Sequence, residues 1–209
     1  LLGVTSQVGG VIVVDQSLPV ILPGQGNQVV DLMESLGPFN ISGNQIAANG
    51  ANLTINHTAG TVFSRAFNHF VAGVLTNNPH ISTTQAQSPA DFIYITQTTT
   101  MAGALTSLID VANYDLAGVV TAIGGGAGRS SVHRVYLFPN NDPQRQLIIQ
   151  YGQEIYANLD AAEAGITTES FTENPSFIQG GGILIAFIAA TRTATSLSDT
   201  SQARIVAAA

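Results

Sequence analysis

An all-β fold, a sandwich or a barrel in a single domain, is the fold class that this 209-residue sequence predicts. Short apolar runs are broken roughly every 8 to 12 residues by Gly, Pro, Asn or Asp, a spacing typical of such folds and not of βαβ units. Apolar residues alternate with polar or aromatic ones along Phe92–Thr96 and Val132–Phe138. Hydrophobic residues make up 45% of the chain, which is enough to bury a core.

The strands are expected where these runs occur, and the two alternating segments are expected to be half-buried. In chain order the expected strands are Val11–Val14, Val29–Met33, Asn52–Asn56, Thr61–Ser64, His80–Gln85, Phe92–Gln97, Gly118–Ile123, Ser131–Phe138, Gln146–Tyr151, Ile183–Ala189 and Ala203–Val206. The cluster Pro139–Arg145 is rich in turn-forming residues. It predicts that the strands on either side of it form an antiparallel hairpin.

One short helix is expected between the last strands. Asn158 is a suitable N-cap for the run Leu159–Ala164, which has acidic residues in its first turns. Gly165 stands where a left-handed residue commonly ends a helix. The sequence therefore predicts about two helical turns here.

The first 50 residues differ in texture, because glycines and prolines interrupt short aliphatic strings. They are either the first part of the β fold, or an extended arm that buries Val11–Val14 and Val20–Leu22 against a neighbouring subunit or another protein. Pro19 and Pro23 favour the arm, because proline is excluded from central strands. We therefore expect an extended N-terminal arm over residues 1–50 and a β-sandwich domain over residues 51–209.

The charge composition excludes several functions. Charged residues are 9% of the chain, with 13 acids against six arginines, no lysine and no cysteine. An acidic chain with scattered arginines is a poor nucleic-acid binder, and lysine chemistry, disulfides and cysteine-ligated metals are impossible. Asn, Gln, Ser and Thr make 63 of the 209 residues, so the expected surface forms neutral hydrogen bonds. The longest apolar stretch, residues 180–190, is too short to span a bilayer.

Two glycine-rich segments have structural interpretations. Gly124–Gly128 followed by Arg129-Ser130 lacks the Gly-Lys-Ser/Thr ending of a phosphate-binding loop and precedes a strand, so we expect a flexible loop between strands. Gly180–Gly182 stands before an expected strand, where glycine permits a bulge or a close approach of another group.

No catalytic, cofactor-binding or metal-binding residue is predicted, and the protein is not expected to be an enzyme. The four histidines lack the spacing of metal ligands, and His133 is expected to point outward or into an interface. Four aspartates near turns are expected to close those turns, which leaves open a glycosidase carboxylate pair among them. The histidines are His57, His69, His80 and His133, and the aspartates are Asp91, Asp110, Asp115 and Asp142.

The tyrosines leave two interpretations open. Together with the many amides and hydroxyls they are the groups that bind neutral sugars or pack wet protein interfaces. For any single tyrosine, an ordinary place in the core or at its rim is the favoured interpretation. The residues are Tyr94, Tyr114, Tyr136, Tyr151 and Tyr156.

Segments spread over roughly residues 50 to 209 follow the pattern of a known module. They are Ala59–Phe63, Asn77–His80, Arg134–Pro139, Ile148–Tyr156 with the helix after it, Asn174-Pro175, Gly182–Ile188 and Thr191–Arg204. This part of the chain resembles the distal β-sandwich module of capsid-decoration (cement), tail-fibre and tailspike proteins of tailed bacteriophages. The motifs carry no catalytic signature.

The resemblance implies a homotrimeric, antiparallel β-sandwich of the jelly-roll or lectin-like kind, displayed on the virion surface. Its partners would be the major capsid protein or fibre and tail proteins, and in addition a host-surface glycan. No nucleic acid, membrane insertion, cofactor or metal is implied. A cement protein of the capsid exterior is favoured, because the sequence has no repeat or heptad that would form a shaft and its N-terminal part is arm-like. The alternatives are a receptor-binding fibre or tailspike tip and, below that, a carbohydrate-active enzyme.

Overall fold

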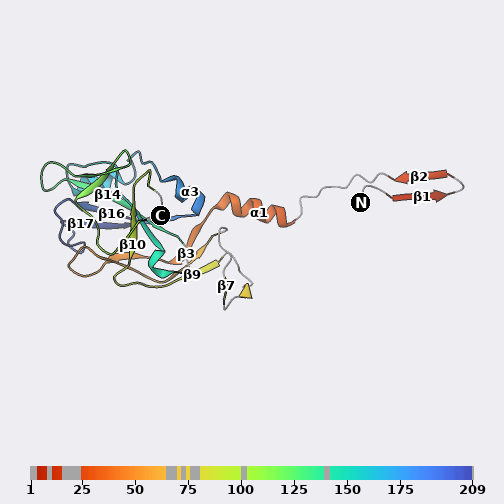
Figure 1. Ribbon diagram of the computed structural model, residues 1–209, viewed down its shortest axis with the longest axis horizontal. Coiled ribbons are helices and arrows are strands. Elements are labelled where there is room, and N and C mark those ends of the chain that lie inside the picture. Colours follow the sequence, from red (N-terminus) through yellow and green to blue (C-terminus); the bar gives the residue numbers. More distant parts are fainter. Residues whose placement is uncertain are drawn as a thin grey trace. The chain divides into compact units, whose positions relative to one another are not determined.

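The computed structural model describes residues 4–8, 11–15, 25–64, 70–71, 74–75, 81–99, 103–138 and 142–208. The chain divides into two compact units, Leu1–Leu36 and Gly37–Ala209 (Figure 1). Most of the regular structure is β-strand and the helices are few, which confirms the expected all-β class. The boundary expected at residue 50 falls inside the larger unit, because strands β3 (Phe39–Gly43) and β4 (Ile46–Ala48) pair with strands that follow in that unit.

The described residues of the smaller unit form one hairpin and one helix. Strands β1 (Val4–Val8) and β2 (Val11–Asp15) are antiparallel, which confirms the strand expected at Val11–Val14. Helix α1 (Gln25–Leu36) contradicts both the strand expected at Val29–Met33 and an arm that is extended throughout. The β-branched pair at residues 29 and 30 suggested a strand, but the apolar positions 29, 32 and 36 follow the helical period. Pro19, Val20–Leu22 and Pro23 lie outside the described residues.

The largest sheet of the other unit has six strands in the order β11-β10-β15-β14-β16-β17. Their bounds are β10 (Phe92–Ile95), β11 (Leu105–Thr106), β14 (Ser130–Leu137), β15 (Leu147–Gln150), β16 (Ile183–Thr191) and β17 (Ala203–Ala207). β14 and β15 form the expected hairpin, with a 3-10 turn at Pro143–Arg145. β10 and β15 are parallel, so the expectation of a wholly antiparallel arrangement is wrong for this pair.

Shorter sheets accompany the large one. The strand expected at Asn52–Asn56 begins later, because the side chain of Asn52 accepts hydrogen bonds from the backbone and hydroxyl of Thr54 and closes a turn there. The order β3-β6-β9 forms a three-stranded sheet, and three further pairs are two-stranded. The remaining bounds are β5 (Ile55–His57), pairing with β4; β6 (Gly60–Phe63); β7 (Phe70–Val71) with β8 (Val74–Leu75); β9 (Ile81–Thr84); and β12 (Asn113–Leu116) with β13 (Val119–Ala122).

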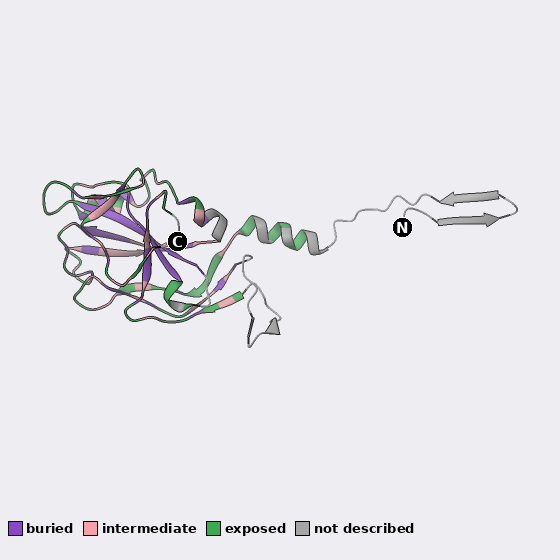
Figure 2. Ribbon diagram, viewed as in Figure 1, coloured by how far each residue is buried: buried purple, intermediate pink, exposed green. Residues whose placement is uncertain are grey.

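Both faces of the six-stranded sheet are covered, as the purple strands at the centre of Figure 2 show. On one face Val135 and Ile149 share a core cluster with Ile55 of β5 and Val62 of β6. On the other face two smaller clusters include residues of helices α2 (Leu159–Gly165) and α3 (Pro175–Gly180). Every residue of β14 is consequently buried, and the expectation that it is half-buried is wrong.

Helix α2 begins as expected, since the Asn158 side chain accepts a hydrogen bond from the backbone N–H of Ala161 at 2.8 Å. Its end differs: Gly165 is the last helical residue and is not left-handed. A Cβ atom at Gly165 would lie 2.4 Å from the ring of Tyr156, so glycine is required there for packing. None of the described helices is long and apolar enough to cross a bilayer.

Candidate functional site

The two described histidines are interior residues. His133 is 1% exposed, so the expectation that it points outward is wrong. Its Nδ1 accepts a hydrogen bond from the backbone N–H of Gly152 at 3.2 Å, and its ring stands edge-on to Tyr94 and Tyr151. Burial lowers the pKa of His133, and likewise that of His57, from 6.5 to about 4, so both are neutral at pH 7.

No metal centre is formed by the part of the chain that the structure describes, where no three His, Asp or Glu side chains gather in a suitable cluster. His57 Nε2 lies 3.1 Å from Asn44 Oδ1, which makes it part of a buried amide contact. His69 and His80 lie outside the described residues.

The aspartates accept hydrogen bonds from backbone N–H groups in turns and, in one case, from a tyrosine hydroxyl. Asp110 Oδ1 accepts from the backbone N–H of Ala112 at 3.2 Å, and its Oδ2 accepts from the Tyr151 hydroxyl at 2.9 Å. Asp142 accepts from the backbone N–H of Gln144 at 3.1 Å. These two therefore have the expected turn-closing role.

Two carboxylates that the structure brings together, Asp160 and Glu163, are both bound by the guanidinium of Arg204. Arg204 Nη2 lies 2.6 Å from Asp160 Oδ1, and Arg204 Nη1 donates to Glu163 Oε2. Asp160 and Glu163 are 81% and 43% exposed at the side chain, so this is a surface ion-pair cluster. The single positive charge of Arg204 is thus shared between the two carboxylates.

Tyrosines fill the core more than they line the surface. Tyr94 and Tyr151 are stacked with their ring centroids 4.4 Å apart. Tyr136 is buried, stacks on Phe177 of α3 at 4.0 Å, and donates from its hydroxyl to Glu173 Oε1 at 3.0 Å. The core interpretation thus holds for these three.

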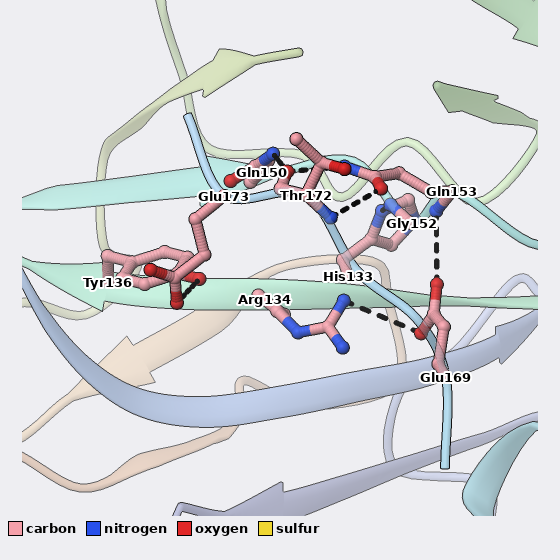
Figure 3. A network of polar contacts seen from close by, with 9 residues as sticks. All are labelled: His133, Arg134, Tyr136, Gln150, Gly152, Gln153, Glu169, Thr172 and Glu173. Atoms are coloured by element: carbon pink, nitrogen blue, oxygen red, sulfur yellow. Dashed lines mark hydrogen bonds and ion pairs between the residues drawn. The ribbon is translucent and has the colours of Figure 1, made fainter. Parts of the chain in front are cut away.

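Arg134 lies at the centre of a polar network that joins β14 to the segment between α2 and α3 (Figure 3). Its Nη1 is 3.4 Å from Glu169 Oε2, and its guanidinium lies over the ring of Phe171 at 3.3 Å. Burial raises the pKa of Glu169, while the Arg134 charge opposes that rise. The ion pair and the cation–π contact neutralise a buried arginine within the chain.

Amide side chains complete the same network. Gln150, which is wholly buried, donates from Nε2 to the Thr172 carbonyl at 2.9 Å (Figure 3). Its side-chain oxygen accepts from the Asn174 backbone N–H at 3.2 Å. Gln153 donates to the same Thr172 carbonyl and accepts from the Thr172 N–H. These bonds hold residues 169–174 against the sheet. We therefore assign the network a structural role.

The glycine-rich segments also serve the fold. Gly124–Gly128 connects β13 to β14 as expected, and Arg192 and Thr193 donate to the carbonyls of Gly125 and Ala127 at 2.6 and 3.1 Å. Gly182 permits the close approach expected for its segment, since a Cβ there would lie 2.5 Å from the Phe138 ring.

The hairpin formed by β12 and β13 presents apolar side chains at its tip. Leu116 and Val119 are paired across the turn and are 52% and 64% exposed. The turn between them is held from below by Asp115, which is 1% exposed and accepts from the backbone N–H groups of Gln97 and Gly118, both at 2.6 Å. Because the buried Asp115 carboxylate fixes the turn by these hydrogen bonds, the exposed Leu116 and Val119 side chains form a rigid apolar surface that is suited to contacts.

A second surface feature is a groove between β3 and strands β16 and β17 of the six-stranded sheet. Two adjoining hollows of about 410 and 330 Å³ share Asn40, Ile185 and Ala208 in their walls. Phe39, 40% exposed, lines the larger hollow and stacks on Phe63 at 5.1 Å. An exposed aromatic ring beside an amide is an arrangement suited to a neutral polar ligand such as a sugar.

Neither surface was among the sequence-based candidates. The groove includes Phe39 and Asn40, which the sequence suggested were part of an arm. The hairpin tip could have been found, because Leu116 and Val119 flank an Ala-Gly pair that suits a tight turn. Comparisons with protein-family models, with curated proteins and with solved structures found no match for this chain.

Proposed function

We propose that this chain is a non-enzymatic virion surface protein of a tailed bacteriophage, a homotrimeric β-sandwich that decorates and reinforces the capsid as a cement protein. The observation that carries the proposal is the division of the chain into a β domain and a second unit whose described residues form a hairpin and a helix. A displayed domain joined to a second unit that is available for contacts with other molecules is an organisation that suits this role. The sequence resemblance over residues 50 to 209 supports the same role.

The β domain has the properties of a displayed module. Its six-stranded sheet is covered on both faces, and its buried charge Arg134 is neutralised by Glu169 within the chain. The sequence has no cysteine, so its stability is independent of redox conditions.

The hairpin tip supplies the contact with the shell in this proposal. Leu116 and Val119 offer apolar area that is already fixed in position, so little conformational entropy is lost on binding. A trimer on a symmetric lattice repeats this contact, and several weak contacts add to a stable attachment.

The test is association of the purified chain with bacteriophage particles that lack it, followed by sedimentation. The double variant Leu116→Asp, Val119→Asp is expected to stay in solution while the parent chain sediments with the particles. Leu108→Asp is the matched control, because Leu108 is 58% exposed and lies outside the hairpin. Failure of the parent chain to associate, or equal association of the double variant, would contradict the proposal.

A receptor-binding tip of a tail fibre or tailspike is the second candidate, and the groove beside Phe39 favours it. In that case a host glycan would stack on Phe39 and bond to Asn40. A glycan array would then give a signal that Phe39→Ala removes and Ile81→Ala leaves unchanged. Ile81 is a suitable control because it is 39% exposed, against 40% for Phe39, and pairs with Phe63 in the same sheet. An array without signal would exclude this candidate.

A further inference from the structure

Helix α1 carries an apolar stripe that is exposed. Val29, Leu32 and Leu36 are 53%, 58% and 58% exposed. Their spacing of three and then four residues puts them on one side of the helix. This is the spacing of the residues that form the seam between helices in a coiled coil.

The unit that contains α1 offers little to stabilise it. The helix has 12 residues, a length at which an isolated helix is marginal in water. Among the described residues of Leu1–Leu36, the other regular structure is the sheet of β1 and β2, and an isolated two-stranded sheet is also only marginally stable in water. Burial of the stripe against another molecule would supply the missing free energy, at about 25 cal/mol for each Å² of apolar surface.

The charges around the stripe indicate which molecule covers it. Gln28 and Ser35 flank the stripe and are neutral and exposed. Asp31 lies outside the stripe, about 100° around the helix from Leu32 and about 160° from Val29. In a parallel bundle of identical helices the flanking residues of one copy meet those of the next, where like charges would repel. Neutral flanks fit a second copy of the same helix and provide no charge to select a different partner.

From this stripe and its neutral flanks we infer that α1 is the self-association helix of the protein, with Val29, Leu32 and Leu36 packed against the same residues of other copies. The number of copies, three, rests on the proposed function. The location of the subunit contact in α1 does not rest on it, and places the contact outside the β domain.

The test uses the full chain and its mass in solution, measured by sedimentation equilibrium at micromolar concentration. The parent chain is expected at about 65 kDa, three times 21.7 kDa, and Leu32→Glu at the monomer mass. Leu108→Glu adds the same charge at a leucine that is equally exposed, at 58%, but lies in the β domain and outside α1, and it is expected to remain a trimer. Because Leu32 is exposed and residues 1–36 contain no aromatic residue, near-ultraviolet circular dichroism, which reports on the β domain, should be the same for all three chains.

The outcomes separate the inference from the proposed function. If Leu32→Glu stays a trimer, the contact lies elsewhere and the inference is wrong, while the homotrimer of the proposed function stands. If the parent chain is a dimer that Leu32→Glu separates, the inference is supported and the trimer is wrong. If the parent chain is a monomer, or binds particles through α1 without self-association, the inference is overturned.

Discussion

Acidification from pH 7 to pH 5 should destabilise this protein, and His133 should account for a defined part of the loss. The imidazole is buried, accepts a hydrogen bond from the backbone N–H of Gly152, and has its pKa lowered to about 4 by burial. Protonation would place a charge between Tyr94 and Tyr151 and remove the acceptor that Gly152 uses.

The sign follows from proton binding in the two states. The unfolded chain, with a histidine pKa of 6.5, binds more protons between pH 6.5 and 4 than the folded chain does. The contribution of His133 to the free energy of unfolding is therefore fully present above pH 6.5, and it is lost as pH decreases from 6.5 to 4. The difference of about 2.5 pKa units corresponds to about 3 kcal/mol below pH 4, and to about 2 kcal/mol at pH 5. His57 adds a similar amount, because its pKa is lowered in the same way.

The assay is urea unfolding, followed by near-ultraviolet circular dichroism, of the parent chain and of His133→Asn at both pH values and at one protein concentration. Asparagine keeps an acceptor near the position of Nδ1 and does not titrate. The free energy of unfolding of the variant should fall by about 2 kcal/mol less than that of the parent between pH 7 and pH 5. Groups such as Glu169 titrate in both chains and cancel in this comparison. Equal pH dependence of the two chains would refute the reasoning.

Three further substitutions test the structure. Asp115→Ala should cost about 2 to 4 kcal/mol in urea unfolding, because the backbone N–H groups of Gln97 and Gly118 lose their buried acceptor; a cost near zero would mean that water replaces it. Gly165→Ala should lower the free energy of unfolding by about 1 to 3 kcal/mol through collision with the Tyr156 ring, whereas a gain in stability would show that helix propensity decides there. Arg204→Met should change the melting temperature less than Asp115→Ala does, and less still in 1 M salt, because its ion pairs with Asp160 and Glu163 are screened; a loss that is unaffected by salt would contradict this.

Local signals in the sequence predicted local structure well. The side chain of Asn158 before an Ala-rich run indicated α2, and the turn residues after Phe138 indicated the hairpin of β14 and β15. The same kind of signal was present at α3 and was missed, since Asn174 accepts from the Ser176 N–H, Pro175 is the first helical residue and Gly181 is left-handed at φ 71°.

Properties that depend on packing between distant segments were not predictable in this way. His133 lies between Val132 and Arg134, and this local pattern did not show that both faces of β14 are covered by elements from other parts of the chain. The parallel pairing of β10 with β15 likewise joins strands about 50 residues apart, and no short-range pattern encodes it. The groove beside Phe39 forms where β3 lies near β16, so the sequence contained no local signal for it.

Reconstruction by cryo-electron microscopy of the intact particle that carries this chain tests the central claim most directly. The account predicts density for the β domain of Gly37–Ala209 on the outer surface of the capsid, in groups of three, with the β12–β13 hairpin facing the shell. Particles that contain no such density, or that hold the chain as isolated single copies, would contradict it.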